Sequence, residues 1–246
     1  MQPPSTALVR LLAPSGTLRA AINVGNPVLA QRAPEGVRGI TVDLARHLAQ
    51  VLQLPLQTVV FESAGKVTDA VAADRWDVAF LAVDPVRARE LAFTQPYLTI
   101  EASFLVHRDA PFTRCADLDA AGRVIVTARG AAYDLHLKRE LRHATMADAA
   151  TPAESLAMFR QGSFDALAGV RQALARAAAE GPYRVLDDSF TQIRQAVALP
   201  KPREAALPWL REFVRDALRT GVIERGVRDS GQTDVSLASA DPEPAG

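Results

Sequence analysis

The chain has 246 residues, of which 48% are hydrophobic and 23% are charged, a profile typical of a folded globular protein with one large domain or two small ones. Lys and Arg number 28 and Asp and Glu number 28, so the net charge is zero, and the sequence contains no basic block that would favour nucleic acid as a partner. Its apolar runs fall far short of the roughly 18–20 residues of a membrane-spanning helix, and its single cysteine and 4 scattered histidines lack metal-ligand spacing, so the sequence predicts no membrane span, no metal and no cofactor.

The first third of the chain predicts alternating strands and helices. Apolar residues alternate over 17–24, which indicates a strand with one buried face, and they recur with helical period over 41–52. A β-branched run at 56–61, a helical period at 66–73 and a nearly continuous apolar run at 78–83 follow. This β-α-β-α-β order predicts an α/β fold with a mainly parallel sheet and helices on both of its faces.

The rest of the chain predicts a second set of strands and helices. Strands are expected at 101–106, 123–127, 165–170, 183–186 and 196–199, and helices at 133–141, 153–159, 172–179 and 207–218. The two ends, 1–15 and 232–246, are expected to be loose. The N-terminal residues show no run of roughly 7–15 apolar residues after a basic start, so they predict no secretory signal, and the chain as written would be cytoplasmic.

Short motifs are spread over about residues 16–231. The most specific is Asp84-Pro-Val-Arg87, followed by Phe93-Thr-Gln-Pro96-Tyr97. The others are Gly39-Ile-Thr-Val-Asp43, Arg75-Trp-Asp77, Ala128-Arg-Gly130 and Gly162-Ser-Phe-Asp165. Together they resemble the family 3 extracellular solute-binding proteins, the amino-acid and opine receptors of ABC importers, whose Thr-Pro-Glu-Arg and Phe-Ser-x-Pro-Tyr have the same Arg-to-Phe spacing.

The resemblance implies a type 2 periplasmic-binding-protein fold with a ligand cleft between two lobes. Lobe 1 would comprise 16–104 plus 196–231 and lobe 2 would comprise 105–195, each a mainly parallel sheet with helices on both faces, joined by two hinge crossovers. It also implies a small carboxylated solute as the ligand, an ABC permease as the partner, a monomer and a periplasmic location. Ligands of open α/β sheets bind at the carboxyl ends of strands, which agrees with this placement.

Arg87 and Gly130 are the strongest candidates for binding the ligand carboxylate. Arg87 follows the strand at 78–83, and its planar guanidinium suits a carboxylate through two parallel hydrogen bonds. The resemblance gives Arg87 that role, and a surface arginine is the alternative. Gly130 ends a strand before a helix whose first N–H groups lack partners, which favours an anion. Ala131 stands where the family has a hydroxyl, so only backbone donors remain there.

Two further positions depart from the family pattern. Asp84 replaces the usual Thr, and Asp before Pro is a preferred helix N-cap, so capping and ligand contact are both open to it. Val170, five residues after Asp165, stands where the resemblance implies the Asp that pairs with the ligand's ammonium. An ordinary α-amino acid is therefore a less secure ligand.

Three further residues are weaker candidates for ligand contact. Arg171 is either a second cation in the cleft or a solvated residue at a helix start. Asn26 follows the first strand, where the family contacts the ligand side chain, and Lys66 begins a helix at the cleft rim. No catalytic residue is expected.

The sequence therefore predicts a solute-binding protein that does no chemistry, with two alternatives. One is an enzyme similar to cyclohexadienyl dehydratase on the same fold, for which Asp84 is the only candidate acid. The other is a cytoplasmic ligand sensor, which the missing signal and the missing lipid-anchor cysteine favour.

Overall fold

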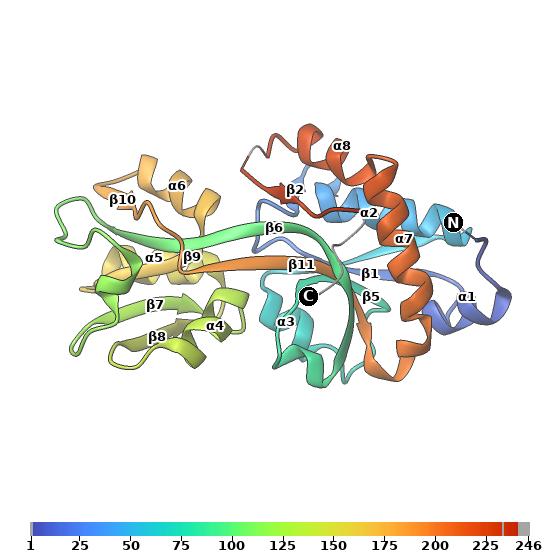
Figure 1. Ribbon diagram of the computed structural model, residues 1–246, viewed down its shortest axis with the longest axis horizontal. Coiled ribbons are helices and arrows are strands. Elements are labelled where there is room, and N and C mark those ends of the chain that lie inside the picture. Colours follow the sequence, from blue (N-terminus) through green and yellow to red (C-terminus); the bar gives the residue numbers. More distant parts are fainter. Residues whose placement is uncertain (1, 233, 241–246) are drawn as a thin grey trace.

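The computed structural model describes residues 2–232 and 234–240, which form two lobes joined by the long strands β6 and β11 (Figure 1). The first lobe, called here the β1 lobe, contains α1 (Thr6–Leu12), β1 (Leu18–Asn23), β2 (Gln31–Ala33), β3 (Gly36–Arg38), α2 (Ile40–Leu52), β4 (Leu56–Phe61), α3 (Ala64–Asp69), β5 (Val78–Ala82), α7 (Leu207–Arg219) and α8 (Val222–Asp229). The second, the β7 lobe, contains β7 (Val124–Ala128), α4 (Ala132–Glu140), β8 (Thr145–Ala149), α5 (Pro152–Gln161), β9 (Ala166–Val170), α6 (Arg171–Ala179) and β10 (Tyr183–Val185). The crossing strands are β6 (Leu91–His107) and β11 (Thr191–Pro200), and the 3-10 turns are η1 (Arg87–Arg89), η2 (Cys115–Leu118) and η3 (Lys201–Ala206).

The sheet order among the described residues is β4-β1-β5-β11-β6-β9-β7-β8. Strand β1 is parallel to β4 and β5, and β7 is parallel to β8 and β9. Strand β11 runs antiparallel to β5 and β6, so the antiparallel pairs lie where the chain crosses between lobes. The predicted α/β class, with two mainly parallel lobes and two crossovers, is confirmed.

Most predicted elements are found, and the largest difference is the length of β6. The sequence predicted a strand only at 101–106, but β6 has 17 residues and begins at Leu91. Pro96, which cannot donate to a sheet ladder, lies inside it. The strand tolerates Pro96 because its partner β11 has register shifts on either side of Ala196.

The chain ends are more ordered than expected where the structure describes them. Ser5 caps α1, because its Oγ accepts the Leu8 N–H at 3.2 Å, and Leu12 is fully buried, so 1–15 is not a loose segment as a whole. Near the other end, β12 (Ser236–Leu237) pairs with β6. The Ala238 N–H also donates to the Tyr97 carbonyl at 3.1 Å, whereas residue 233 and residues 241–246 of the expected loose end lie outside the described residues.

Asp77, the acidic residue of the Arg-Trp-Asp motif, holds the β1 lobe together. Its carboxylate is fully buried and accepts the Arg19 backbone N–H at 2.8 Å and the Arg19 side chain at 2.7 Å. Arg203, from η3, donates to the same carboxylate at 2.6 Å. A buried carboxylate must be paired, so Asp77 has a structural role in this lobe.

The two lobes meet where β6 and β11 pair with each other between their contacts to the lobe sheets. Ala102 already pairs with Val170 of β9, and Gln195 pairs with Ala82 of β5. Between these positions, β6 residues 99–101 face β11 residues 192–194. Within the part of the chain that the structure describes, no helix combines the length and the apolar character that crossing a membrane requires.

Candidate functional site

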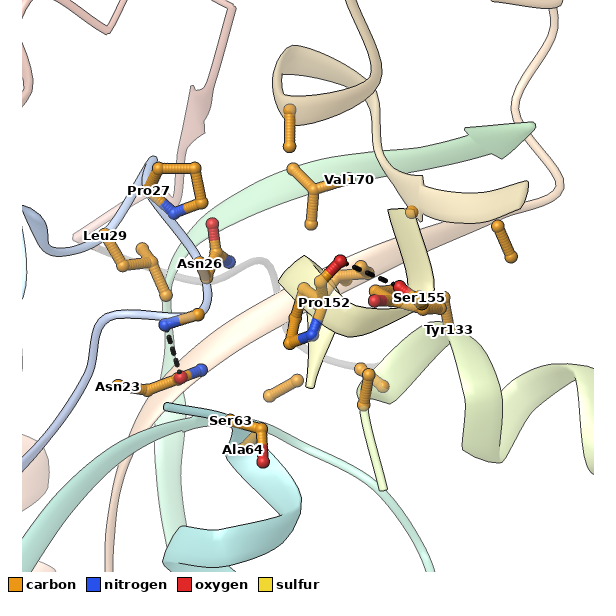
Figure 2. A pocket seen from close by; sticks show the side chains of 18 of the residues that line it. Asn23, Asn26, Pro27, Leu29, Ser63, Ala64, Tyr133, Pro152, Ser155 and Val170 are labelled. Carbon is orange, nitrogen blue, oxygen red and sulfur yellow. Dashed lines mark hydrogen bonds between the residues drawn. The ribbon is translucent and has the colours of Figure 1, made fainter. Parts of the chain in front are cut away.

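A cavity of about 100 Å³ lies between the two lobes (Figure 2). One wall comes from the β1 lobe, with Asn23, Ser63 and Ala64, and the opposite wall comes from the β7 lobe, with Tyr133, Pro152 and Ser155. A single water molecule needs roughly 10–15 Å³ of such space, so the cavity has room for a small organic molecule. Most of its lining is apolar, and a few polar groups converge on it, which is typical of a ligand site.

Arg87 is the charged residue among the described residues that line this cavity. Although it stands in the short turn η1, it is only 2% exposed. Its Nη1 donates to the Ala82 carbonyl at 2.9 Å, and its Nη2 donates across the lobe boundary to the Gly130 carbonyl at 2.8 Å. Nε is buried and has no acceptor among the described residues. A guanidinium carries five N–H donors, so it can still offer an anion in the cavity a pair of hydrogen bonds.

The charge on Arg87 is held in an unfavourable environment. Burial lowers its pKa to about 10, while Asp84 and Asp134 act in the opposite direction. Arg87 is therefore still a cation at neutral pH, but it has lost much of the hydration that an exposed arginine keeps. An anion that entered the cavity would compensate for that loss, and this electrostatic gain favours a negatively charged ligand.

Gly130 lies beside Arg87, but its N–H is already used. This N–H donates to Asp134 Oδ2 at 2.8 Å, and the Asp134 carboxylate also accepts Thr127 Oγ1 at 2.7 Å. The next N–H, of Ala131, donates to the Ala128 carbonyl at 3.0 Å. Gly130 thus presents its carbonyl to Arg87, and its expected role as an amide donor to the ligand is not the one that this geometry provides.

The backbone N–H groups that could donate to a ligand are those at the start of α4, two or three residues after Gly130. Ala132 and Tyr133 open this helix, and both line the cavity. The first N–H groups of a helix have no intrahelical acceptor, and the helix dipole is positive at this end. Burial also raises the pKa of the Tyr133 phenol, so the phenol stays protonated. An anion in this cavity would therefore meet the start of α4 on the side of the β7 lobe.

Asp84 acts as a cap and ties the lobes together. Its Oδ1 accepts the Val86 N–H at 2.8 Å, which is the capping arrangement that the sequence favoured. Its Oδ2 accepts from Arg139 Nη1 of the β7 lobe, also at 2.8 Å. Both oxygens are engaged, and Asp84 does not line the cavity among the described residues.

The lobes also touch through two glycines. A Cβ added to Gly65 would lie 2.7 Å from the Arg129 carbonyl oxygen, and one added to Gly130 would lie 2.7 Å from the Gly65 Cα. Gly130 has a φ of +71°, which L side chains rarely adopt. The close approach of Gly65 to 129–130 therefore requires glycine on both sides.

The three weaker candidates for ligand contact lie in three different parts of the structure. Asn26 lines the cavity, where its Oδ1 accepts the Val28 N–H at 3.2 Å. Lys66 lines an adjoining hollow that also contains Glu62 and Glu154. Arg171 lies elsewhere, because it pairs with Glu101 at 2.8 Å and donates to the carbonyls of 186–188. The structure therefore does not place Arg171 as a second cation in the cavity, and the ligand roles of the others stay predictions.

Two features of the wall bear on the ligand's charge. Val170 lines the cavity, and none of the lining residues that the structure describes is Asp or Glu. Gln195, which the sequence analysis did not select, also lines it, and its Oε1 is buried without a partner among the described residues. The signal for Gln195 was present in the sequence, because it is a polar residue that begins an otherwise apolar strand segment.

Comparison with known proteins agrees with this architecture. The sequence model described as bacterial extracellular solute-binding proteins, family 3, matches residues 18–193. No curated protein sequence matches the chain significantly.

Several solved structures share the fold at low sequence identity. The cysteine-binding protein from Campylobacter jejuni is 15% identical with a TM-score of 0.80, and the match covers 95% of this chain and 99% of that one. A mutant of ArgBP from T. maritima is 17% identical with a TM-score of 0.78, covering 92% and 100%. The ancestral amino-acid-binding protein AncCDT-1, a precursor of cyclohexadienyl dehydratase, is 20% identical with a TM-score of 0.74, covering 90% and 98%.

Proposed function

The chain belongs to family 3 of the bacterial extracellular solute-binding proteins, and on this premise we propose that it binds a small carboxylate in the cavity between its lobes. The observation that carries the proposal is Arg87, a buried cation on the cavity wall whose Nε lacks an acceptor among the described residues. A carboxylate that accepts from Nε and from one Nη of this guanidinium would satisfy both its charge and its geometry.

Ligand binding would be coupled to closure of the lobes. The proposed moving units are residues 16–104 plus 196–231 and residues 105–195, connected only by β6 and β11. Arg87 comes from the first unit and the N-terminus of α4 from the second, so a carboxylate between them binds the closed form better than the open form. This differential affinity is what a ligand needs to shift such an equilibrium.

In the cell, this protein would deliver its ligand to an ABC permease as the extracytoplasmic, monomeric component of an importer. The names of structurally similar proteins support a binding role, since they include receptors for cysteine and a protein called ArgBP. The dehydratase alternative would need an acid at the cavity. Asp84, the candidate acid from the sequence, is engaged by the Val86 N–H and by Arg139.

A thermal-shift screen followed by calorimetry tests the proposal. The screen covers amino acids, hydroxy acids, oxo acids, opines and dicarboxylates, because a ligand that binds only the folded state raises the melting temperature. At least one carboxylate should stabilise the wild type, and Arg87→Ala should lose about 2–5 kcal/mol of its binding free energy. Mass spectrometry of the incubated ligand should show it unchanged. Near-normal affinity in Arg87→Ala would refute the proposed clamp, and conversion of the ligand would favour the enzyme.

A further inference from the structure

Gln195 is a second polar residue of the cavity. A ligand with only a carboxylate would leave its side-chain amide unused. Its side chain lines the cavity and is only 4% exposed. Its amide oxygen has no hydrogen-bond donor among the described residues. Buried polar atoms in folded proteins are nearly always paired, so an unpaired amide oxygen on a residue that lines a ligand-sized cavity points to a donor that the ligand supplies.

Gln195 and Arg87 are brought together by one residue, Ala82. Gln195 of β11 is the register partner of Ala82 on β5, and the Arg87 guanidinium donates to the Ala82 carbonyl at 2.9 Å. Neighbouring strands lie roughly 4.8 Å apart, and Gln195 and Arg87 both line the same cavity. A donor on the carbon next to the carboxylate is therefore the one best placed to meet Gln195 while the carboxylate meets Arg87.

The donor on that carbon can be an ammonium or a hydroxyl, and the charges on the residues that line the cavity distinguish the two. An ammonium brings a full positive charge and three N–H groups next to Arg87, and it needs counter-charge or several acceptors when it is buried. The described lining residues include no Asp or Glu, and Val170 presents methyl groups to the cavity. A hydroxyl carries no charge, and the single oxygen of Gln195 satisfies its proton.

We propose that the preferred ligand is a small 2-hydroxy acid, held through its carboxylate by Arg87 and through its hydroxyl by Gln195. This assignment rests on the proposed function and names the class of ligand within it. It makes Gln195 a specificity-determining residue.

The direct test measures paired ligands by calorimetry on the wild-type protein. Two carbon skeletons are used, the three-carbon acids and the 4-methylpentanoic acids, each as the 2-hydroxy, 2-oxo, 2-amino and unsubstituted form. In the skeleton that fits, the 2-hydroxy acid should bind at least about tenfold more tightly than the 2-amino acid and the unsubstituted acid. A 2-amino acid that binds as tightly or more tightly overturns the inference and leaves the proposed carboxylate function standing. If no carboxylate in either series or in the wider screen binds, both are overturned.

Two substitutions separate the roles of the amide and the charge. Gln195→Leu should bring the 2-hydroxy acid to within about threefold of the unsubstituted acid. The control is Gln192→Leu, an exposed glutamine on the same strand, which should leave the ratio unchanged. An unaltered preference in a folded Gln195→Leu protein overturns the assignment to Gln195.

The second substitution supplies the missing negative charge. Val170→Asp should shift the ratio at least about tenfold toward the 2-amino acid, because its carboxylate would face the ligand's ammonium. Val170→Asn has nearly the same shape without the charge and should not cause this shift. An equal shift in both variants contradicts the electrostatic argument. The paired titrations of the wild type decide the proposal even where a variant does not fold.

Discussion

The close contact between Gly65 and residues 129–130 predicts that Gly65→Ala weakens ligand binding without unfolding either lobe. The new Cβ would lie 2.7 Å from the Arg129 carbonyl oxygen, although carbon and oxygen make comfortable contact at roughly 3.5 Å. The clash exists only when the lobes are closed, because the two groups belong to different lobes. The substitution therefore penalises the closed form selectively.

The size of the effect follows from the overlap. Relief requires the lobes to part locally by about 0.8 Å, since 3.5 Å less 2.7 Å is 0.8 Å. The same movement would stretch the 2.8 Å hydrogen bond from Arg87 to the Gly130 carbonyl beyond its normal range. Overpacking of this kind costs about 1–3 kcal/mol. The dissociation constant should therefore rise about 5- to 150-fold.

Calorimetry measures the change in affinity, and small-angle scattering measures how far the ligand still compacts the protein. The matched control is Gly226→Ala on α8, where a new Cβ would lie 3.4 Å from its nearest neighbour, the Ile40 Cα. The control should bind like the wild type. A Gly65→Ala protein that binds within twofold of the wild type, with the same compaction, would refute closure around the ligand as the basis of binding.

Three further predictions concern groups outside the cavity wall. Asp77→Asn should lower the free energy of unfolding by about 3 kcal/mol in urea titrations, because it leaves Arg19 and Arg203 without their buried counter-charge, and the ligand preference should be unchanged. Arg139→Ala should weaken binding by about 0.2–1 kcal/mol in calorimetry, since it removes a half-exposed ion pair to Asp84 that forms only between closed lobes, and tighter binding would contradict this role. Burial raises the pKa of the Cys115 thiol to about 12, so at pH 8 it should react with thiol reagents far more slowly in the native protein than in urea, and equal rates would show that the site is open.

The sequence predicted best what depends on local pattern. The run at 56–61 became β4 with the same limits, because β-branched and aromatic residues between turn residues suit a pleated, half-buried strand. The Asp84 cap was also visible, since its partner is the N–H two residues further along the chain. Hydrogen bonds between residues so close in the chain can be predicted from the local sequence.

The sequence could not predict which groups meet across the two lobes. Arg87 was recognised as a ligand candidate, but its bond to the Gly130 carbonyl joins residues 43 positions apart. Arg139 reaches Asp84 from 55 positions away and was not selected at all. Gln195 became a candidate only when its strand was placed beside Ala82. Such contacts are set by the packing of one lobe against the other, which periodicity does not encode.

The same limit explains why the sequence left open whether Arg171 lies in the cleft or at a helix start. Its position directly after a strand end would suit a ligand contact as well as it suits a helix start. In the structure, its guanidinium donates hydrogen bonds to Glu101 of β6 and to the carbonyls of 186–188. Those partners lie on other segments of the chain. The residues next to Arg171 in the sequence therefore do not predict which groups its guanidinium binds.

The claim that Arg87 binds the ligand's carboxylate is tested most directly by a double comparison in the calorimeter. The best-binding acid and its primary carboxamide, which has nearly the same shape but no charge, are each titrated into the wild type and into Arg87→Ala. Amidation should weaken binding to the wild type by at least about 30-fold, as expected for the loss of a buried charge pair, and the difference should nearly disappear in Arg87→Ala. An amide that binds the wild type almost as well as the acid, or a penalty for amidation that persists in Arg87→Ala, would contradict this claim.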